Sequence, residues 1–352
     1  MKTKILKVDY LNPKEEYLSE AGEVIRNGGL VIIPTETVYG IACNAQNKYS
    51  MERLRRIKAR PKDKPFSYII GNKEDVEGLA RDIPAPAYKL MDRFWPGPLT
   101  IVLLSKERGT AGIRMPDDEI ALKVIKMAEV PVVCPSANLS GKPAPLDFAQ
   151  AIADLDGLAD LAIDAGEAKL GKESTVVDLS RGLLNILREG ALKKEEIEAV
   201  AKRKTVLFVC TGNSCRSVMA QGLLQKKLKE KNRADVEVIS AGIMMLQGLG
   251  ATQETKDLLS YEGIDVSAHR SQRATKGLLG KSDLILVMER LQEEHILQIS
   301  PEVKKRLFLL KEFAKINQGS TDIEDPIGKS QEFYASTFAV IKEAIERIAD
   351  II

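Results

Sequence analysis

A cysteine and an arginine six positions apart are the residues of this sequence best suited to chemistry. Cys210 and Arg216 enclose the five residues TGNSC, and a loop of that length can wrap around a tetrahedral oxyanion. Gly212 tolerates the backbone conformation that such a wrap requires, and the arginine offers a planar fork to two phosphate oxygens. The positive field of the loop favours the thiolate form of Cys210, which is a nucleophile at neutral pH. The spacing therefore indicates phosphoryl-transfer chemistry.

The flanking segments are of the kind that position an anion-binding loop. The apolar run Thr205–Val209 predicts a β-strand that ends at Cys210, and the amphipathic segment Ser217–Glu230 predicts a helix. Backbone N–H groups at a helix N-terminus lack partners and the helix dipole is positive there, so strand, loop and helix together form an anion cradle. The spacing alone would also fit a buried cysteine followed by a surface arginine, but Gly212 and Asn213 in this setting favour the cradle.

From Thr205 to the C-terminus the sequence resembles the low molecular weight protein tyrosine phosphatase family. The resemblance implies that Cys210 attacks phosphorus, that Arg216 binds the phosphoryl group and that Ser217 hydrogen-bonds the thiolate. Asn213 would hold the shape of the loop. The phosphate-binding loop would consist of the residues between the catalytic pair, namely Thr211, Gly212, Asn213, Ser214 and Cys215.

Attack by a thiolate requires an acid that protonates the leaving group. The resemblance places this acid at Asp325, in the sequence DIEDP ahead of the last helix, whereas composition alone leaves Asp322 and Glu324 as competitors and an exposed acidic turn as the plain alternative. Cys215 lies within reach of Cys210 in a wrapped loop. It would either form a reversible disulfide that protects the nucleophile from over-oxidation or serve as a small packed side chain.

Two departures from tyrosine-selective members of that family bear on the substrate. Those members carry aromatic residues after the Asp-Pro pair, where this sequence has Ile327 and Gly328. Ser214 stands where they tend to be aliphatic and where the bacterial protein-arginine-phosphatase branch has threonine. We therefore expect phosphoarginine rather than phosphotyrosine. Thioredoxin-coupled arsenate reductases share the loop, but they need further cysteines downstream to relay a disulfide, and none follows Cys215.

Six short motifs follow one another through the first half of the sequence. Several combine hydroxyl, amide or cationic residues at the ends of predicted strands, where α/β sheets place ligands. The motifs are PTETVYGI from Pro34, KARP from Lys58, WPGPLT from Trp95, IRMP from Ile113, PSANLSG from Pro135 and ESTVVD from Glu173. The first alone also fits a polar turn, and the second alone fits a solvated charge run. Their ordered combination is more specific than any one of them.

In this order and at these separations the motifs resemble the YrdC-type L-threonylcarbamoyladenylate synthases, over about Leu11 to Leu192. That family joins L-threonine, bicarbonate and ATP into threonylcarbamoyl-AMP and pyrophosphate, and the product is a diffusible precursor for threonylcarbamoyladenosine in tRNA. The resemblance assigns the threonine pocket to Thr35, Arg114, Ser136 and Ser174. It assigns ATP binding to Lys58, Arg60, Lys64, Thr110, Asn138 and Arg188.

No residue of this half is an obvious nucleophile or base, so the expected mechanism is positioning with electrostatic stabilisation. Adenylation develops negative charge on the α-phosphate, which clustered cations and an expected Mg²⁺ would stabilise. No set of protein side chains is predicted to hold a metal. Two positions depart from many members of the family: Ile69 stands where a histidine lies near threonine, and Glu189 stands where proline follows the arginine.

Length and periodicity predict two α/β domains. The chain has 352 residues, and we expect a YrdC-like twisted α/β sheet domain over residues 1–202 and a doubly wound parallel-sheet phosphatase domain over residues 203–352. The charged segment 193–204 is helix-prone and is either a terminal helix or a spacer. Further predicted helices are Glu15–Arg26, Ser50–Ile57 and Thr252–Gly263, and predicted strands are Leu30–Ile33, Val236–Ile239, Leu284–Met288 and Leu307–Leu310.

Composition limits the compartment and the partners. The net charge is only +2, which predicts no large basic surface for nucleic acid. The resemblance to the synthases implies that tRNA is served indirectly, through the diffusible product. Four cysteines and no apolar leader or membrane span predict a cytoplasmic protein. The sequence has only two histidines, His269 and His295, so neither a His-based metal centre nor a Ser-His-Asp triad is expected. The expected partners are L-threonine, bicarbonate, ATP and a phosphorylated protein, and no membrane is expected. The phosphatase half is expected to need no cofactor.

A different interpretation is that one half is a non-catalytic ligand-binding or regulatory module.

Overall fold

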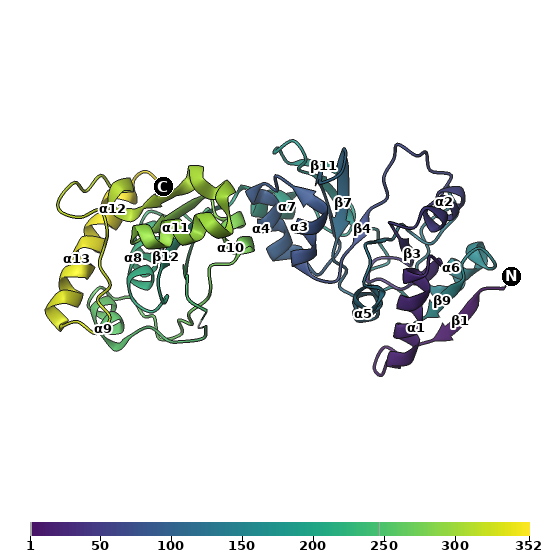
Figure 1. The fold of residues 1–352 in the computed structure, drawn as a ribbon, viewed down its shortest axis with the longest axis horizontal. Coiled ribbons are helices and arrows are strands. Elements are labelled where there is room, and N and C mark those ends of the chain that lie inside the picture. Colours follow the sequence, from purple (N-terminus) through teal and green to yellow (C-terminus); the bar gives the residue numbers. More distant parts are fainter. Residues whose placement is uncertain (1, 246) are drawn as a thin grey trace. The chain divides into compact units, whose positions relative to one another are not determined.

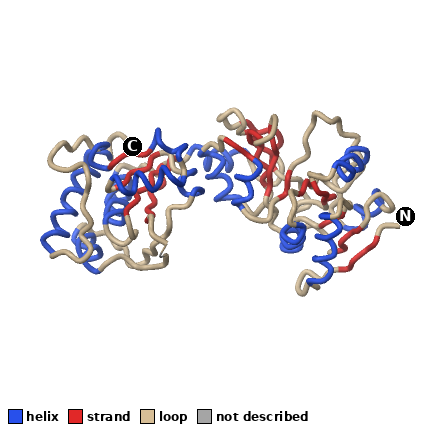
Figure 2. Tube along the Cα trace, viewed as in Figure 1, coloured by secondary structure: helices blue, strands red, loops and turns tan. Residues whose placement is uncertain are grey.

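The computed structural model describes residues 2–245 and 247–352 in two compact units, Met1–Ala201 and Lys202–Ile352 (Figures 1 and 2). Each unit has hydrophobic clusters of its own and carries one of the two predicted sites. Within the described residues, no helix combines the length and the apolarity needed to cross a bilayer.

The first unit is built on one mixed sheet. Its strands are β1 Lys4–Lys7, β2 Val31–Ile33, β3 Gly40–Asn44, β4 Tyr68–Ile69, β5 Ala80–Arg81, β6 Leu99–Ser105, β7 Thr110–Arg114, β8 Val132–Val133, β9 Leu161–Asp164, β10 Thr175–Asp178 and β11 Asn185–Arg188. They hydrogen-bond in the order β1-β9-β2-β3-β8-β4-β7-β6-β10-β11, and β5 pairs with β6. The sheet contains parallel pairs such as β1 with β9 and antiparallel pairs such as β2 with β3. The predicted α/β sheet is confirmed.

Helices cover this sheet (Figure 1). They are α1 Glu15–Arg26, α2 Lys48–Ile57, α3 Val76–Leu79, α4 Ala85–Phe94, α5 Glu119–Ala128, α6 Phe148–Leu155 and α7 Lys194–Lys202, with a 3₁₀ turn at Lys73–Asp75. The side chains of Asn47, Asp118 and Asp147 cap α2, α5 and α6 by accepting backbone N–H groups of the first turn. Helices α1 and α5 pack together over the buried residues of β2 and β9.

The register of the sheet brings distant motifs together. Gly40 at the start of β3 forms a bridge with Ser136, which lies just after β8. Ile69 on β4 pairs with Arg114 on β7. Strand β10, which follows Ser174, runs parallel to β6. Because of these pairings, residues more than a hundred positions apart in the sequence face one region.

The second unit is a parallel sheet with helices on both faces. Its strands are β12 Lys204–Cys210, β13 Val236–Gly242, β14 Leu284–Val287 and β15 Leu307–Leu309, in the order β13-β12-β14-β15. Its helices are α8 Arg216–Glu230, α9 Gln253–Tyr261, α10 Lys276–Lys281, α11 Arg290–Ile299, α12 Leu310–Phe313 and α13 Gln331–Ile348, with a 3₁₀ helix at Pro301–Arg306. All three strand pairs are parallel. The predicted doubly wound fold is confirmed.

The side chains of β12 alternate between the two faces of this sheet. Val206 and Phe208 pack in one cluster with α8 and α13, whereas Leu207 and Val209 pack in the other with α10 and α11. The central strand is buried on both faces, as a parallel sheet requires.

The predicted elements lie within a few residues of the observed ones. Helix α1 has the predicted bounds, but β13 extends through Gly242 rather than ending at residue 239. The extension arises because Gly242 still pairs with Cys210 in the ladder. A Cβ atom on Gly242 would lie only 2.8 Å from the backbone oxygen of Thr211, so a glycine allows the phosphate loop to approach β13 closely.

Candidate active sites

A cavity of about 490 Å³ in the first unit gathers the residues predicted to bind threonine and ATP. Every one of them except Asn138 lines it, and the residues that do so are Thr35, Lys58, Arg60, Lys64, Thr110, Arg114, Ser136, Ser174 and Arg188. Ile69, at the position that departs from the family, lines the same cavity. The site is therefore assembled from segments that the sheet brings together.

Asn138 joins this site through Lys58. The Lys58 Nζ donates to the Asn138 backbone oxygen at 2.8 Å and to its Oδ1 at 2.7 Å, and also to the Ser136 backbone oxygen at 3.0 Å. The Ser136 hydroxyl donates to the same Asn138 Oδ1 at 2.6 Å. Burial, with a contribution from the charge of Arg60, lowers the pKa of Lys58 to about 8. The ammonium is thus held at the cavity wall by neutral oxygens.

The cationic loop after α2 is folded on itself. Arg60 donates from Nε to the Lys64 backbone oxygen at 3.3 Å and from Nη2 to the Pro65 backbone oxygen at 2.7 Å. The guanidinium groups of Arg55 and Arg60 both lie over the Phe66 ring, at 5.5 and 5.1 Å from its centroid. Burial, followed by repulsion from Arg55, lowers the pKa of Arg60. The loop thereby presents several cations to one cavity.

Arg188, which was predicted to bind ATP, is hydrogen-bonded to Ser174, which was predicted to bind L-threonine. Its Nε and Nη2 donate to the Ser174 backbone oxygen at 3.1 and 2.9 Å, and its Nη1 donates to Glu173 Oε1 at 2.7 Å. The hydroxyls of Ser174 and Thr100 lie 2.9 Å apart. One hydrogen-bonded chain therefore links the two groups of predicted ligands.

Arg114 has a buried acidic partner that the sequence did not single out. Its Nη2 lies 2.7 Å from Glu36 Oε1, and the two side chains are only 12% and 4% exposed. Its Nε donates to the Gly97 backbone oxygen at 3.2 Å. Thr35, next to the acid, donates from its hydroxyl to the Val38 backbone oxygen at 2.6 Å. The sequence could have indicated Glu36 as a site residue through its position in the turn after β2, at the end of a buried strand.

The phosphate loop of the second unit surrounds the Cys210 sulfur with donors. The Ser217 hydroxyl lies 3.0 Å from the sulfur, and the Asn213 backbone N–H donates to it at 3.3 Å. Asn213 adopts a left-handed conformation with φ +53°, which asparagine tolerates better than most residues. This bend points the Asn213 backbone N–H inward, as an anion cradle requires.

The Asn213 side chain fixes that bend. Its Nδ2 donates to the hydroxyls of Ser217 at 3.0 Å and Ser240 at 2.8 Å, and its Oδ1 accepts from the Gln272 backbone N–H at 2.9 Å. The His269 Nε2 lies 2.7 Å from the Asn213 backbone oxygen. The family resemblance implied that Asn213 holds the shape of the loop. Its contacts with Ser240 and His269 were not predicted.

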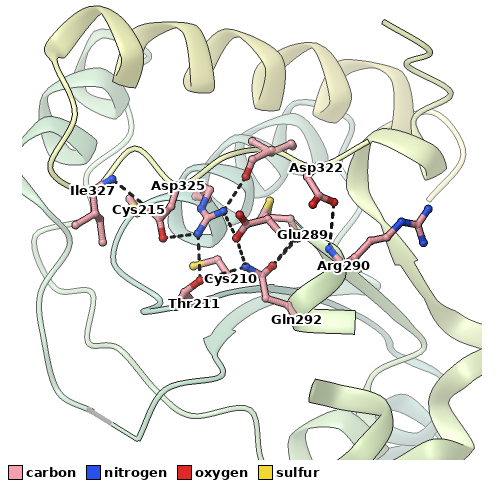
Figure 3. A network of polar contacts seen from close by, with 12 residues as sticks. Cys210, Thr211, Cys215, Glu289, Arg290, Gln292, Asp322, Asp325 and Ile327 are labelled. Atoms are coloured by element: carbon pink, nitrogen blue, oxygen red, sulfur yellow. Dashed lines mark hydrogen bonds and ion pairs between the residues drawn. The ribbon is translucent and has the colours of Figure 1, made fainter. Parts of the chain in front are cut away.

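Arg216 is fully buried and already paired. Figure 3 labels its partners Thr211, Glu289 and Asp325. The Arg216 Nη1 donates to Glu289 Oε2 at 2.6 Å and to the Ile323 backbone oxygen at 2.7 Å, and its Nη2 donates to Thr211 Oγ1 at 3.2 Å and to Asp325 Oδ2. Burial opposes the charge, but the neighbouring anions, Cys210 first, outweigh it and raise the pKa of Arg216. Its Nε is buried without an acceptor among the described residues, so a donor remains for a phosphoryl oxygen.

Asp325 stands beside the loop. Its Oδ1 accepts from the Ile327 backbone N–H at 3.2 Å, and the Cys215 sulfur lies 3.8 Å from the same oxygen. Burial, followed by the negative charges of Cys210 and Asp325, raises the pKa of Cys215 to about 12. Cys215 is therefore a protonated thiol beside the acid.

The competing acids lie elsewhere. Asp322 accepts from the Arg290 backbone N–H at 3.1 Å, at the start of α11, and Glu324 is exposed. Figure 3 shows Asp322 on the far side of Glu289 from the cysteines. Of the three acids of this segment, Asp325 is the one that contacts Arg216.

Glu289 and Gln292 complete the loop's surroundings and were not predicted. Gln292 donates from Nε2 to Glu289 Oε2 at 2.7 Å and to Thr211 Oγ1 at 3.2 Å, and its Oε1 accepts from the backbone of Met288 at 2.9 Å. Glu289 follows β14, which lies next to the strand that carries Cys210. An acid at the carboxyl end of a neighbouring parallel strand was a usable sequence signal.

Comparison with known proteins assigns a family to each unit. The Sua5/YciO/YrdC family model, described as telomere recombination, matches residues 23–190. A second model, described as low molecular weight phosphotyrosine protein phosphatase, matches residues 205–352.

Named relatives agree with both models. The Threonylcarbamoyl-AMP synthase of Pyrococcus abyssi is 42% identical over 212 residues, which are 58% of this chain and 62% of that protein. The solved structure of P. abyssi Sua5 complexed with L-threonine is 30% identical, with a TM-score of 0.54, and the match covers 87% of this chain and 99% of that chain. A Ralstonia nicotianae protein named "Probable low molecular weight protein-tyrosine-phosphatase EpsP" is 37% identical over 143 residues, 41% of this chain and 92% of that protein. The chain belongs to both families.

One chain therefore joins a unit of the Sua5/YciO/YrdC family, Met1–Ala201, and a unit of the low molecular weight phosphatase family, Lys202–Ile352, as the sequence predicted. These are called the synthase unit and the phosphatase unit below, after their families. The chain spans 62% of the length of the P. abyssi synthase. Among the described residues, no group of three or more histidine, cysteine, aspartate or glutamate side chains could hold a metal ion. In the synthase unit, Asp63 and Glu173 are the carboxylates that line the cavity.

Proposed function

We propose that the synthase unit makes L-threonylcarbamoyladenylate and pyrophosphate from L-threonine, bicarbonate and ATP. The observation that carries the proposal is the single cavity that gathers Thr35, Arg114 and Ser174 with Lys58 and Arg188. Its volume of about 490 Å³ is in the range of small-molecule sites. The P. abyssi relative crystallised with L-threonine supports the amino-acid part of this proposal.

The proposed reaction needs positioning more than it needs a catalytic base. The threonine amine attacks CO₂ derived from bicarbonate and loses a proton, which gives a carbamate. A carbamate oxygen then attacks the α-phosphorus of ATP, and pyrophosphate leaves. Arg114 would bind the threonine carboxylate, and the cations of the loop after α2 together with Arg188 would stabilise the charge that develops on the phosphates.

A magnesium ion is part of this proposal. Mg²⁺ keeps several waters and is usually bound by substrate phosphates with one or two carboxylates, so the metal would arrive with ATP. Asp63 is the lining carboxylate without a protein partner among the described residues, whereas Glu173 is paired with Arg188. The metal would supply charge stabilisation at the phosphates.

The test of this function is direct. Purified full-length protein is given ATP, bicarbonate and L-threonine with Mg²⁺, and the nucleotide product is identified by mass. We expect threonylcarbamoyl-AMP and equimolar pyrophosphate. Binding of ATP and threonine without any product would favour the rival function, in which this unit is a ligand-binding or regulatory module.

For the phosphatase unit we propose a cysteine-dependent protein phosphatase with a phosphocysteine intermediate. The Cys210 thiolate attacks phosphorus while Asp325 protonates the leaving group, and the aspartate then takes a proton from the water that hydrolyses the intermediate. The donors around the sulfur and the free Nε of Arg216 support this assignment. No cofactor is required by this chemistry.

Phosphoarginine is the proposed substrate, in preference to phosphotyrosine. Ile327, which follows the Asp-Pro pair, is exposed and has no aromatic ring to stack on a phenyl group, and Ser214 supplies a hydroxyl within the phosphate loop. The test compares kcat/KM for a phosphoarginine peptide and a matched phosphotyrosine peptide. A higher value for the phosphotyrosine peptide would contradict the proposal.

We further propose that residues 1–202 and 203–352 act as separate enzyme domains in the cytoplasm, where tRNA is served only through the diffusible adenylate. The two sites share no substrate, so each activity should persist when the other is removed by mutation. Loss of both activities by one active-site substitution would contradict this independence.

A further inference from the structure

Glu36 is a buried acid outside the set of residues predicted to bind substrate. It is 3% exposed and does not line the cavity itself. Both carboxylate oxygens are buried, and among the described residues the Arg114 guanidinium is their sole ion-pair partner, at 2.7 Å. Neither oxygen accepts a hydrogen bond from the described residues, so the ion pair is the interaction that compensates the buried charge. An acid is retained in such a place only where its charge is matched closely.

The turn that carries Glu36 is held rigidly on both sides. The Thr35 hydroxyl oxygen accepts from the backbone N–H groups of Thr37 and Val38 at 3.3 Å each. The Leu170 backbone N–H donates to the Glu36 backbone oxygen at 2.7 Å. The carboxylate is therefore a fixed point rather than a mobile surface charge.

Arg114 has little freedom as a result. Its Nε is bound to the Gly97 backbone oxygen and its Nη2 is paired with Glu36, so two of its three nitrogens have protein partners. The Nη1 has no partner among the described residues and is the nitrogen left for an incoming anion. A planar guanidinium whose other two nitrogens are fixed presents the third in one direction.

We propose that Glu36 is the positioning residue that aims Arg114 at the carboxylate of L-threonine. The inference rests on the proposed synthase function and names a residue for the amino-acid half of that site. Precise placement of a carboxylate-binding group matters because the rate gain from binding two reactants together depends on holding them in the reactive geometry. Glu36 acts through Arg114 and does not touch the substrate.

The charge of Glu36 and its positioning of Arg114 predict opposite changes in threonine binding when Glu36 is neutralised, so the two explanations can be distinguished. Glu36 and Arg114 form a neutral pair, and removal of the negative charge would make the site more attractive to an anionic carboxylate. If charge alone mattered, Glu36→Gln would lower the KM for threonine. If positioning matters, the same substitution releases Arg114 and raises it.

The experiment measures threonine binding by calorimetry and steady-state kinetics on the full-length Glu36→Gln protein. We expect the Kd and the KM for L-threonine to rise about tenfold or more, while the KM for ATP changes less than about twofold. Glu36→Asp keeps the charge on a shorter side chain and should lie between wild type and Gln. Glu129→Gln, which breaks an exposed ion pair with Arg26, is the matched control and should change neither constant.

The outcomes separate this inference from the proposed function. An unchanged or lower threonine KM in Glu36→Gln, with an active wild type, overturns the inference alone. A wild type that neither binds threonine nor forms product overturns both. Where Glu36→Gln does not fold, as judged by its thermal unfolding, Glu36→Asp decides: a threonine KM equal to that of wild type would overturn the inference.

Discussion

The two sites proposed to bind phosphoryl oxygens are built in opposite ways. In the phosphatase unit, the nucleophile and most of its donors come from the continuous loop Cys210–Ser217, between one strand and one helix. In the synthase unit, the cavity is lined by residues from Thr35 to Arg188, which the sheet register brings together. The first design depends on local backbone conformation, and the second depends on the whole fold of the unit.

The same comparison shows a shared feature in the cations. Arg216 is paired with Glu289 and Asp325, and Arg114 is paired with Glu36. Lys58 is held instead by neutral oxygens. Each of these cations is thus oriented by protein groups before a ligand arrives, which lowers the reorganisation required during the reaction.

The largest expected effect tests the local design. Cys210→Ser removes the nucleophile, and we expect phosphatase kcat to fall by about 10⁴-fold or more, since a nucleophile acts as a unit with its partners. Pyrophosphate release by the synthase unit in the same sample should be unchanged. Both activities are measured on one preparation with p-nitrophenyl phosphate and with ATP plus threonine. Undiminished phosphate release would refute the assigned nucleophile.

The next effect sharpens the assignment of the acid. Asp325→Asn should lower phosphatase kcat by about 10²- to 10⁴-fold, because general acid catalysis contributes that much. Asp322→Asn is the matched control, since Asp322 contacts the start of α11 and not Arg216. Its kcat should fall by less than tenfold, which corresponds to less than about 1.4 kcal/mol in the barrier. Equal losses in the two variants would show that the segment matters only for structure.

The local design is also the one that the sequence predicts more completely. The strand, loop and helix from Thr205 to Glu230 follow from the sequence pattern, and the family resemblance implied the roles of Asn213 and Ser217. The contact between these two side chains spans only four positions. Glu289 was missed because its contact with Arg216 spans 73 positions and depends on which strand lies beside β12. Such pairings are set by packing, which periodicity does not reveal.

In the synthase unit, the family motifs predicted which residues gather but not how they are paired. Arg114 was predicted to bind a carboxylate, yet its buried partner Glu36 emerges only from the structure. The role of Asn138 as an acceptor for Lys58 likewise depends on a contact across 80 positions. Motif order identifies the members of a dispersed site, whereas the ion pairs among them require three-dimensional information.

A third test measures how much the Glu36–Arg114 ion pair contributes to the stability of the synthase unit. Arg114→Ala leaves the Glu36 carboxylate buried without its partner, and we expect the synthase unit to lose about 3 kcal/mol of unfolding free energy. The double variant Glu36→Gln/Arg114→Ala should recover part of that loss, because no unpaired charge then remains. Denaturant unfolding with a probe in the synthase unit measures both. A double variant no more stable than Arg114→Ala would contradict a buried unpaired charge as the cause.

The smallest effect concerns the pH dependence of the synthase. Burial lowers the pKa of Lys58 to about 8, so the ammonium is charged below that pH and loses its proton above it. Attraction for the ATP phosphates should weaken accordingly, and kcat/KM for ATP at saturating threonine should fall about tenfold per pH unit above pH 8. Lys58→Arg keeps a charge throughout this range and should shift the descending limb to higher pH, even if its activity at pH 7 is lower. A limb at the same pH in both proteins would mean that another group titrates, because a guanidinium does not lose its proton there.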